Sequence, residues 1–282
     1  MLRSIEALEK YAIHASDGKI GHVTDFYFDD DAWVVRYLIV DTGTWLSDRK
    51  VLISPISIGH LDEKSKIVQA LLTQEQVKNS PDIDTQKPVS RQHEMGYLGY
   101  YGYPYYWDGA GLWGPGSFPS LMLSGIDTNN EAEYDKQQIV FSQQRLDGQT
   151  TGSQSTLSGS AKPASIKRDD PHLRSCRAVL GYEIQATDGH MGHVAGFLVD
   201  EQTWAIRYLI VETSHWWSGH KVLIVPEWIS SVNWFESTVS VALSRADVKE
   251  SPPFDSTIEL DREQEVGLYK HYDRSGYWTN QL

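Results

Sequence analysis

Most of this 282-residue sequence occurs twice, with the second copy displaced by 171 residues. Asp17-Gly-Lys-Ile-Gly-His-Val23 returns as Asp188-Gly-His-Met-Gly-His-Val194, and Arg36-Tyr-Leu-Ile-Val40 returns as Arg207-Tyr-Leu-Ile-Val211. From residue 17 to residue 81, 28 of 65 aligned positions are identical, without a gap. Agreement at this level indicates duplication of one structural unit, which decides the architecture to be expected.

The repeated unit extends past residue 90. At the same offset, six residues of the first copy have identical counterparts in the second: Arg91, Glu94, Gly96, Tyr101, Tyr106 and Trp107 match Arg262, Glu265, Gly267, Tyr272, Tyr277 and Trp278. We therefore predict one repeat over residues 1–107, a linker over 108–171 and a second repeat over 172–282, which are ordinary sizes for two domains.

The region around the linker has two parts of different composition. Residues 96–118 are dominated by Gly, Tyr, Trp and Pro, whereas residues 142–170 are rich in Ser, Gln, Thr and Gly. Because the second part has few apolar residues to bury, it is predicted to be a disordered, flexible tether. The aromatic content of the first part leaves open whether that part is ordered.

Each copy has the pattern of a small β domain. Asp17-Gly18 and Asp188-Gly189 lie between short apolar segments, which predicts hairpins with positive φ at both central turn positions. Gly21 and Gly192 fall inside the outgoing strands and predict a bulge or sharp bend. Further strands are expected over 33–41, 50–55 and 67–72, and over 204–212, 221–226 and 238–243. Short strands at this spacing favour a barrel or sandwich.

Helices are expected only after these strands. Thr73 and Ser244 have the pattern of helix N-caps, and Pro81 and Pro252 end the short helices that follow. A second helix is expected over 89–101 and 260–272, with the first copy a poorer helix former because of its glycines.

Several of these motifs occur together in a known order. Asp-Gly-x-x-Gly-His-Val is followed by Phe26/Phe197, by Asp29/Asp200 and by Arg-Tyr-Leu-Ile-Val with an acidic residue, and Val-Lys-x-Ser-Pro ends each unit. The combination resembles the PRC-barrel family, which includes the cytoplasmic domain of the photosynthetic reaction-centre H subunit and the C-terminal domain of the ribosome maturation factor RimM. The resemblance implies two tandem β-barrels that bind other macromolecules and carry no catalytic residues.

Charge and cysteine content restrict the partners and the compartment. The net charge of −13 is divided as −4, −3 and −6 over residues 1–90, 91–172 and 173–282, so no segment is basic enough to favour nucleic acid. A single cysteine, Cys176, fits a reducing compartment, and the apolar runs are too short to span a membrane. We expect a cytoplasmic protein that reaches a membrane only peripherally, through a membrane complex.

Candidate reactive groups are few. His22, His193 and His190 suggest a metal site, but Lys19 replaces His190 in the first copy, which favours structural or surface histidines. Asp29-Asp-Asp31 resembles the start of a calcium loop without its later ligands, so a solvated turn is expected. Arg36/Arg207 and Asp41/Glu212 lie on opposite faces of one strand and are not expected to pair. We predict no catalytic, cofactor-binding or metal-binding residues.

Aromatic residues are the candidates for an interface. Trp45, Trp216 and Trp217 lie in polar loops, where tryptophan anchors an interface or covers its own barrel. Both copies keep a Tyr-Trp pair, Tyr106-Trp107 and Tyr277-Trp278, which we expect to clamp the appendage onto a barrel. Intramolecular pairing of the barrels about an approximate two-fold axis is the preferred geometry, and a homodimer is the alternative.

The function expected from the sequence is a non-enzymatic adaptor that docks to a protein complex. Two alternatives stay open. The first is a ribosome- or RNA-associated assembly factor, as in RimM, and the second is small-molecule or metal binding between the barrels.

Overall fold

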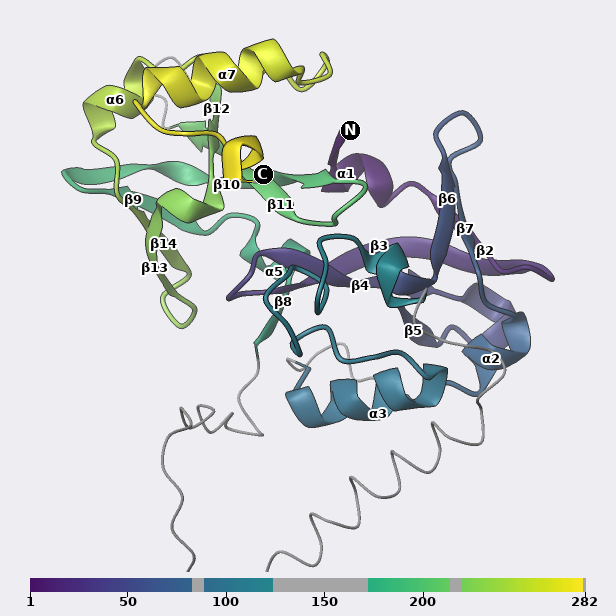
Figure 1. Ribbon diagram of the computed structural model, residues 1–282. Helices are drawn as coiled ribbons and strands as arrows, with labels where there is room; N and C mark the ends of the chain where they lie inside the picture. Colours follow the sequence, from purple (N-terminus) through teal and green to yellow (C-terminus); the bar gives the residue numbers. More distant parts are fainter. Residues whose placement is uncertain (83–88, 124–171, 214–219, 281–282) are drawn as a thin grey trace, which may run out of the picture.

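Two β-sheets of seven strands each form the body of the molecule (Figure 1). The computed structural model describes residues 1–82, 89–123, 172–213 and 220–280. The helices are short and lie at the margins of the sheets. The prediction of a mainly β fold with two small β domains is confirmed.

The first repeat places its strands in the order β5-β4-β3-β2-β7-β6. In chain order its elements are β1 (Leu2–Ser4), α1 (Ile5–Leu8), β2 (Ala12–His14), β3 (Lys19–Asp29), β4 (Val34–Asp41), η1 (Gly43–Leu46), β5 (Lys50–Ile53), η2 (Pro55–Ser57), β6 (Ile58–Asp62), β7 (Ile67–Ala70), α2 (Gln74–Lys78), α3 (Arg91–Tyr101) and η3 (Pro119–Met122).

The second repeat has the equivalent order, β12-β11-β10-β9-β14-β13. Its elements are β8 (Leu173–Ser175), α5 (Cys176–Val179), β9 (Glu183–Ala186), β10 (Gly189–Asp200), β11 (Ile206–Thr213), β12 (Lys221–Ile224), η6 (Pro226–Trp228), β13 (Ile229–Asn233), β14 (Thr238–Val241), α6 (Arg245–Lys249), α7 (Arg262–His271) and η7 (Tyr277–Asn280).

The bend glycines have the role predicted for them. A Cβ atom on Gly21 would lie 1.9 Å from the backbone oxygen of Asp41, and one on Gly192 would lie 2.2 Å from that of Glu212. Only glycine allows the long strands β3 and β10 to approach β4 and β11 this closely, and register shifts occur along both ladders.

Both predicted hairpins are present, since β2 pairs with β3 and β9 pairs with β10, but their turns differ from the prediction. Of the four central turn residues only Gly189 has a positive φ, of 132°. The Asp17 carboxylate instead accepts a hydrogen bond from the backbone N–H of Gln74 at 2.8 Å, and Asp188 accepts one from Arg245 at 2.8 Å. Helix N-termini leave backbone N–H groups unpaired, so each aspartate satisfies a helix of its own repeat rather than the tight turn assumed from Asp-Gly alone.

The predicted helices are present in both repeats. Thr73 and Ser244 each form a reciprocal capping box at the start of α2 and α6. The longer helices α3 and α7 occupy the two stretches where a second helix was expected. In the first copy Gly102 ends the helix with φ of 67°, a left-handed conformation that glycine adopts without strain.

The first strand of each repeat pairs with the sheet of the other repeat. Strand β1 pairs with β10, from Leu2 opposite Asp200 to Ser4 opposite Leu198. Strand β8 pairs with β3 in the same way, from Leu173 opposite Asp29 to Ser175 opposite Tyr27. The sequence units 1–107 and 172–282 and the hydrogen-bonded sheets therefore differ by one exchanged strand.

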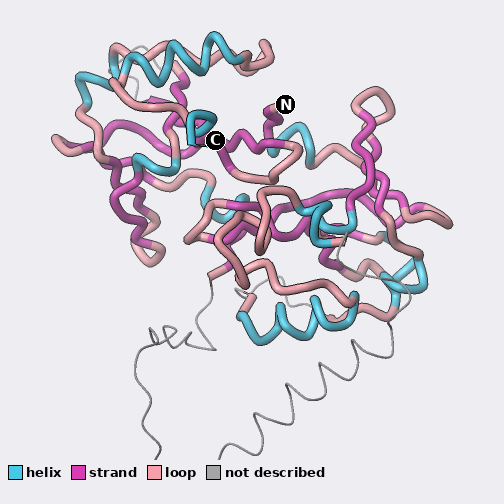
Figure 2. The backbone as a smooth tube through the Cα atoms, in the orientation of Figure 1, coloured by secondary structure: helices cyan, strands magenta, loops and turns pink. Residues whose placement is uncertain are grey.

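An approximate two-fold axis passes between the two halves. Val34 forms an isolated antiparallel bridge with Ala205, its own counterpart at the offset of 171 residues. The flanking hydrogen bonds are reciprocal: Val35 donates to the oxygen of Trp204 at 2.8 Å, and Ile206 donates to that of Trp33 at 2.7 Å. Figure 2 shows the N-terminal strand at this junction. The barrels thus associate within one chain.

The aromatic stretch after Trp107 is packed against the barrels. Trp113 is fully buried, and its indole N–H donates to the backbone oxygen of Thr203 at 2.8 Å, so the stretch contacts both repeats. Helix η3 packs on η2. Residues 108–123, assigned above to the linker, are thus part of the folded body, whereas the predicted tether over 142–170 lies outside the described residues.

Candidate interaction cleft

A buried arginine holds the β3–β4 turn of the first barrel. The Arg36 guanidinium lies 3.2 Å from the Asp29 carboxylate and 3.8 Å from the centre of the Tyr106 ring, and all three side chains are buried. It also donates to the backbone oxygen of Leu112 at 2.6 Å. Because a buried guanidinium must be paired and hydrogen-bonded, these contacts fix both the turn and the segment that follows Trp107.

A glutamate with no exposed surface lies beside this arginine. Glu94 on α3 accepts a hydrogen bond from the Tyr106 hydroxyl at 2.7 Å, and its carboxylate lies 2.6 Å from His172 Nε2 and 3.4 Å from Arg91. Burial, with the Glu94 charge adding to it, raises the pKa of Tyr106 well above its ordinary value, so this phenol remains a hydrogen-bond donor. The cluster joins α3 to the start of the second repeat.

The second barrel contains an equivalent cluster. Glu265 on α7 accepts hydrogen bonds from Tyr208 at 2.8 Å and Tyr277 at 2.9 Å, and lies 2.9 Å from Arg262. Arg207 lies 4.1 Å above the Tyr277 ring and 3.4 Å from Asp200. Burial raises the pKa of Tyr277 to about 12. The charged framework is therefore duplicated along with the barrels.

A cleft of about 890 Å³ lies between the barrels, and we call it the open cleft. Its lining includes residues of the β13–β14 hairpin and the first residue of α3, two elements that Figure 1 labels. One wall is the β3–β4 turn from Asp30 to Trp33 together with Arg91, and the other contains Arg207 and residues of η6 and β13. Arg174 lines it too, pairing with Asp30 at 2.7 Å and lying 4.4 Å from the Trp234 ring.

The position related to the open cleft by the two-fold axis is occupied, and we call it the filled cleft. Residues 108–123 lie there, with Trp113 against Arg36 and the β10–β11 turn, and only Leu112 of this segment also lines the open cleft. The space that remains beside them is about 370 Å³ and is lined by Met1, Phe118 and Thr203 among others. The junction between the two barrels, which we call the seam, is therefore closed on one side by the chain itself and exposed on the other.

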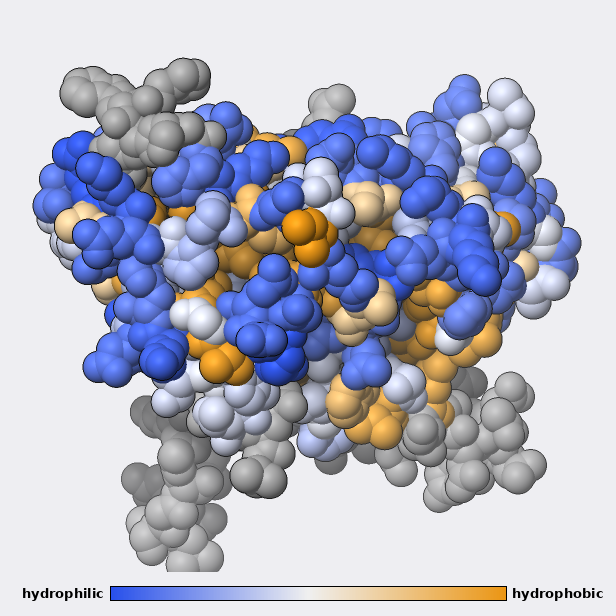
Figure 3. All heavy atoms as spheres, turned by 90° about the horizontal axis from the view of Figure 1, so that it is seen from above, coloured by the Kyte–Doolittle hydropathy of each residue, from blue (hydrophilic) through white to orange (hydrophobic). Residues whose placement is uncertain are grey.

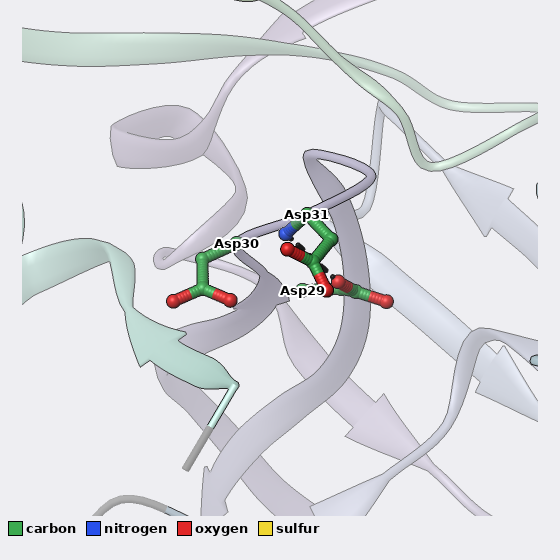
Figure 4. Close-up of side chains that lie close together, drawn as sticks. All are labelled: Asp29, Asp30 and Asp31. Carbon is green, nitrogen blue, oxygen red and sulfur yellow. Dashed lines mark hydrogen bonds between the residues drawn. The ribbon is translucent and has the colours of Figure 1, made fainter. Parts of the chain in front are cut away.

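The acidic triplet predicted as a solvated turn forms that turn, but not all of it is solvated. Asp29 is buried and Asp31 is exposed. Figure 4 shows the hydrogen bond from the Asp31 backbone N–H to Asp29, at 3.0 Å. Although the three carboxylates lie within 4.8 Å of one another, Asp29 and Asp30 are engaged by Arg36 and Arg174. The turn explains these residues without an ion.

The predicted interface tryptophans divide into two groups. The side chain of Trp45 is 37% exposed, and its indole N–H donates to the backbone oxygen of Ile20 in its own barrel. It therefore combines internal packing with an accessible face. Trp216 and Trp217 lie outside the described residues.

The two Tyr-Trp pairs lie within the buried clusters. Tyr106 is buried against Arg36, and Trp107 stacks under Arg91 at 4.1 Å. Trp278 stacks under Arg262 at 4.3 Å in the same way. Each pair thus holds the appendage on its own barrel, with Tyr106 buried and Trp107, Tyr277 and Trp278 half-buried.

The histidines and the strand-end charges have local partners. His22, His190 and His193 are exposed, and His193 lies 3.9 Å from Glu212. Arg36 pairs with Asp29, and Arg207 pairs with Asp200, each on the neighbouring strand. Neither arginine pairs with the acidic residue at the end of its own strand, as expected for side chains on opposite faces of that strand.

Sequence reasoning missed three residues of the seam: Trp113, His172 and the cleft-facing Arg207. Trp113 has no counterpart in the second copy, so comparison of the two repeats did not single it out. His172 aligns with Met1, a difference at the edge of the repeat. Arg207 was available as a repeated arginine, but its exposure to the cleft follows from how the barrels associate.

The face that carries the N-terminus is largely polar. Seen from above, on the face that carries the N-terminus, apolar side chains form patches over the junction and beside it, within a mostly hydrophilic surface (Figure 3). Within the described part of the chain, no helix combines the length and apolar character needed to cross a bilayer.

Comparison with known proteins gives one assignment. No curated protein matches the chain. Residues 8–76, which include β2 to β7 and most of α2, match the family model of the PRC-barrel domain. The chain therefore contains a PRC-barrel domain, formed by its first repeat.

Proposed function

We propose that this protein is a non-enzymatic adaptor, in which two PRC-barrel units joined by strand exchange dock onto a protein complex. The second repeat shares the element order of the first and is identical to it at 28 of 65 aligned positions, which supports a second unit of the same kind. The buried thiol of Cys176 is consistent with the cytoplasmic location that we include in the proposal.

The observation that carries the proposal is the engagement of the charged groups at the seam. Asp29, Asp30 and Glu94 are bound by Arg36, Arg174 and His172, respectively. A general acid or base must face its substrate with a proton position free for transfer. These carboxylates hold turns and helices together instead, and the open cleft offers a surface for association.

A second candidate function is supported by the size of the open cleft. Its 890 Å³ lies within the range of small-molecule sites, about 300–1,000 Å³. RNA association receives no such support, because the net charge of −13 opposes contact with phosphates.

Affinity capture from a native extract of the source organism distinguishes these candidates. Tagged full-length protein is incubated with extract with and without ribonuclease, and the bound fraction is analysed by quantitative and native mass spectrometry. We expect one protein near equimolar ratio to the bait, retained after nuclease treatment. Loss with nuclease would support the RNA alternative, and a bound small molecule without a protein would support the ligand alternative.

A further inference from the structure

The two clefts at the seam are built from equivalent residues, so the filled cleft shows what the open cleft can bind. In the filled cleft, Arg36 Nη1 donates to the backbone oxygen of Leu112 at 2.6 Å. The next residue, Trp113, lies 4.8 Å from the Arg36 guanidinium and donates its indole N–H to the oxygen of Thr203. One arginine and one turn carbonyl thus hold a segment of bends and turns at a tryptophan.

Both of these anchors recur in the open cleft. Arg207 and Ala32, the counterparts of Arg36 and Thr203, line it together. The two turns have the same geometry, because Asp29 and Asp200 accept equivalent backbone hydrogen bonds. The tryptophan that follows each turn carbonyl, at positions 33 and 204, has φ of 53° and 58°. The Ala32 carbonyl is therefore placed as the Thr203 carbonyl is.

Arg36 uses one of its guanidinium nitrogens, Nη1, to hold residues 108–123, and the equivalent nitrogen of Arg207 can make the same contact with an occupant of the open cleft. The hydrogen bonds of Arg207 within the described residues come from Nη2, to Asp200 and Thr203, and none comes from Nη1, the nitrogen that Arg36 uses for Leu112. No carbonyl among the described residues accepts from Arg207 Nη1 as the Leu112 carbonyl accepts from Arg36. A peptide carbonyl in the cleft would supply this acceptor.

The charge of the open cleft distinguishes its occupant from residues 108–123. Glu227 is exposed there, whereas its counterpart Ile56 is buried on η2, on which η3 packs. Glu227 and Asp31 form no ion pair among the described residues, while Arg91 and Arg174 are paired with Glu94 and Asp30. The unpaired charge is therefore negative and favours a basic residue in the occupant.

We propose that the open cleft binds a segment of a partner protein that carries a tryptophan followed downstream by a basic residue. Arg207 donates to the carbonyl that precedes the tryptophan, the indole N–H donates to Ala32, and the basic residue faces Glu227 and Asp31. This inference rests on the proposed docking function and assigns the surface that performs it.

The test uses a fluorescent synthetic peptide of residues 108–123 with Met122→Lys, titrated into the full-length protein. We expect saturable 1:1 binding that weakens at least about tenfold with Arg207→Ala, the cost of a hydrogen bond to a charged donor. A peptide that also carries Trp113→Ala should not bind.

A matched pair of surface variants separates the cleft from general effects. Ser231 lines the open cleft and is exposed, and its counterpart in the first repeat, His60, is exposed too. Ser231→Trp should block the peptide, while His60→Trp should bind it as the unchanged protein does. Circular dichroism of both variants verifies that the fold is retained.

Three outcomes would overturn the inference: no saturable binding, equal affinity for the Ser231→Trp protein, or cross-links from the cleft to residues 124–171, which would make the chain its own occupant. Affinity capture with two baits, the unchanged protein and the Ser231→Trp variant, separates this inference from the proposed function. If both baits capture the same native partner equally, the protein still has a docking function, but the partner does not bind in the open cleft. A bait that captures no partner in either form contradicts the docking function itself.

Discussion

Glu94 and Glu265 occupy equivalent positions on α3 and α7, yet different neighbours surround them. Glu94 has no exposed surface and contacts His172, whereas the corresponding place near Glu265 belongs to Met1. The paired arginines differ as well, since the side chain of Arg91 is 15% exposed and that of Arg262 is 53% exposed. Duplication thus preserved the internal framework, while the seam was completed on one side only.

The largest loss of stability is expected when a glutamate of one of these clusters is replaced. Glu94→Leu leaves Arg91 and His172 without their shared carboxylate and should lower the free energy of unfolding by about 4 kcal/mol, as loss of one partner of a buried ion pair does. Glu265→Leu should cost about 2 kcal/mol, because Arg262 can turn to solvent. Urea unfolding of both variants measures this order, and a larger loss for Glu265→Leu would contradict the comparison.

Next in size is the effect of removing a tryptophan from each cleft. Trp113→Ala removes a fully buried ring and should cost about 3 kcal/mol. Trp234→Ala in the open cleft removes a partly exposed ring that stacks on Arg174 and should cost about 1 kcal/mol. Equal losses in thermal or urea unfolding would mean that the two clefts are closed to the same degree.

The last comparison concerns one phenol of each cluster, whose effect on stability is expected only at alkaline pH. Burial raises the pKa of Tyr106 well above 10 and that of Tyr277 to about 12. A pKa that is higher in the folded state gives stability that is complete below the unfolded value near 10 and declines as pH rises above it. Each such tyrosine should cost about 1.4 kcal/mol per pH unit, for Tyr277 only up to about pH 12.

Urea unfolding at pH 9, 10 and 11 measures that decline. Tyr106→Phe and Tyr277→Phe should each make it shallower, because the substituted ring has no proton to lose. Stability that does not change over this range would show that neither phenol is protected by its cluster.

The local features of the fold were accessible from sequence because each depends on residues close together in the chain. Gly21 and Gly192 indicated the bend, and Thr73 and Ser244 indicated the caps, since a strand or a short helix requires these residue types. The Asp-Gly pairs indicated the two hairpins correctly but not the conformation of their turns, because Asp17 binds Gln74, a residue far along the chain that a local turn rule ignores.

The candidate site was much less accessible, because it forms where the repeats meet. Leu2-Arg3-Ser4 recurs as Leu173-Arg174-Ser175, a signal that is too short to predict which sheet each strand joins. Trp113 belongs to a stretch of ambiguous composition. The burial of Arg36 and the exposure of Arg207 to a cleft follow from that stretch, and two identical motifs cannot reveal the difference.

The exchange of β1 and β8 has a consequence for any attempt to divide the protein. A fragment containing only the first half would carry an orphaned N-terminal arm and leave the edge of β3 bare from Tyr27 to Asp29. Two such fragments could each place the N-terminal strand on the β3 edge of the other, because the two repeats exchange these strands as the subunits of a domain-swapped dimer do. Each sheet is therefore complete only when two repeats associate, either within one chain or as two fragments.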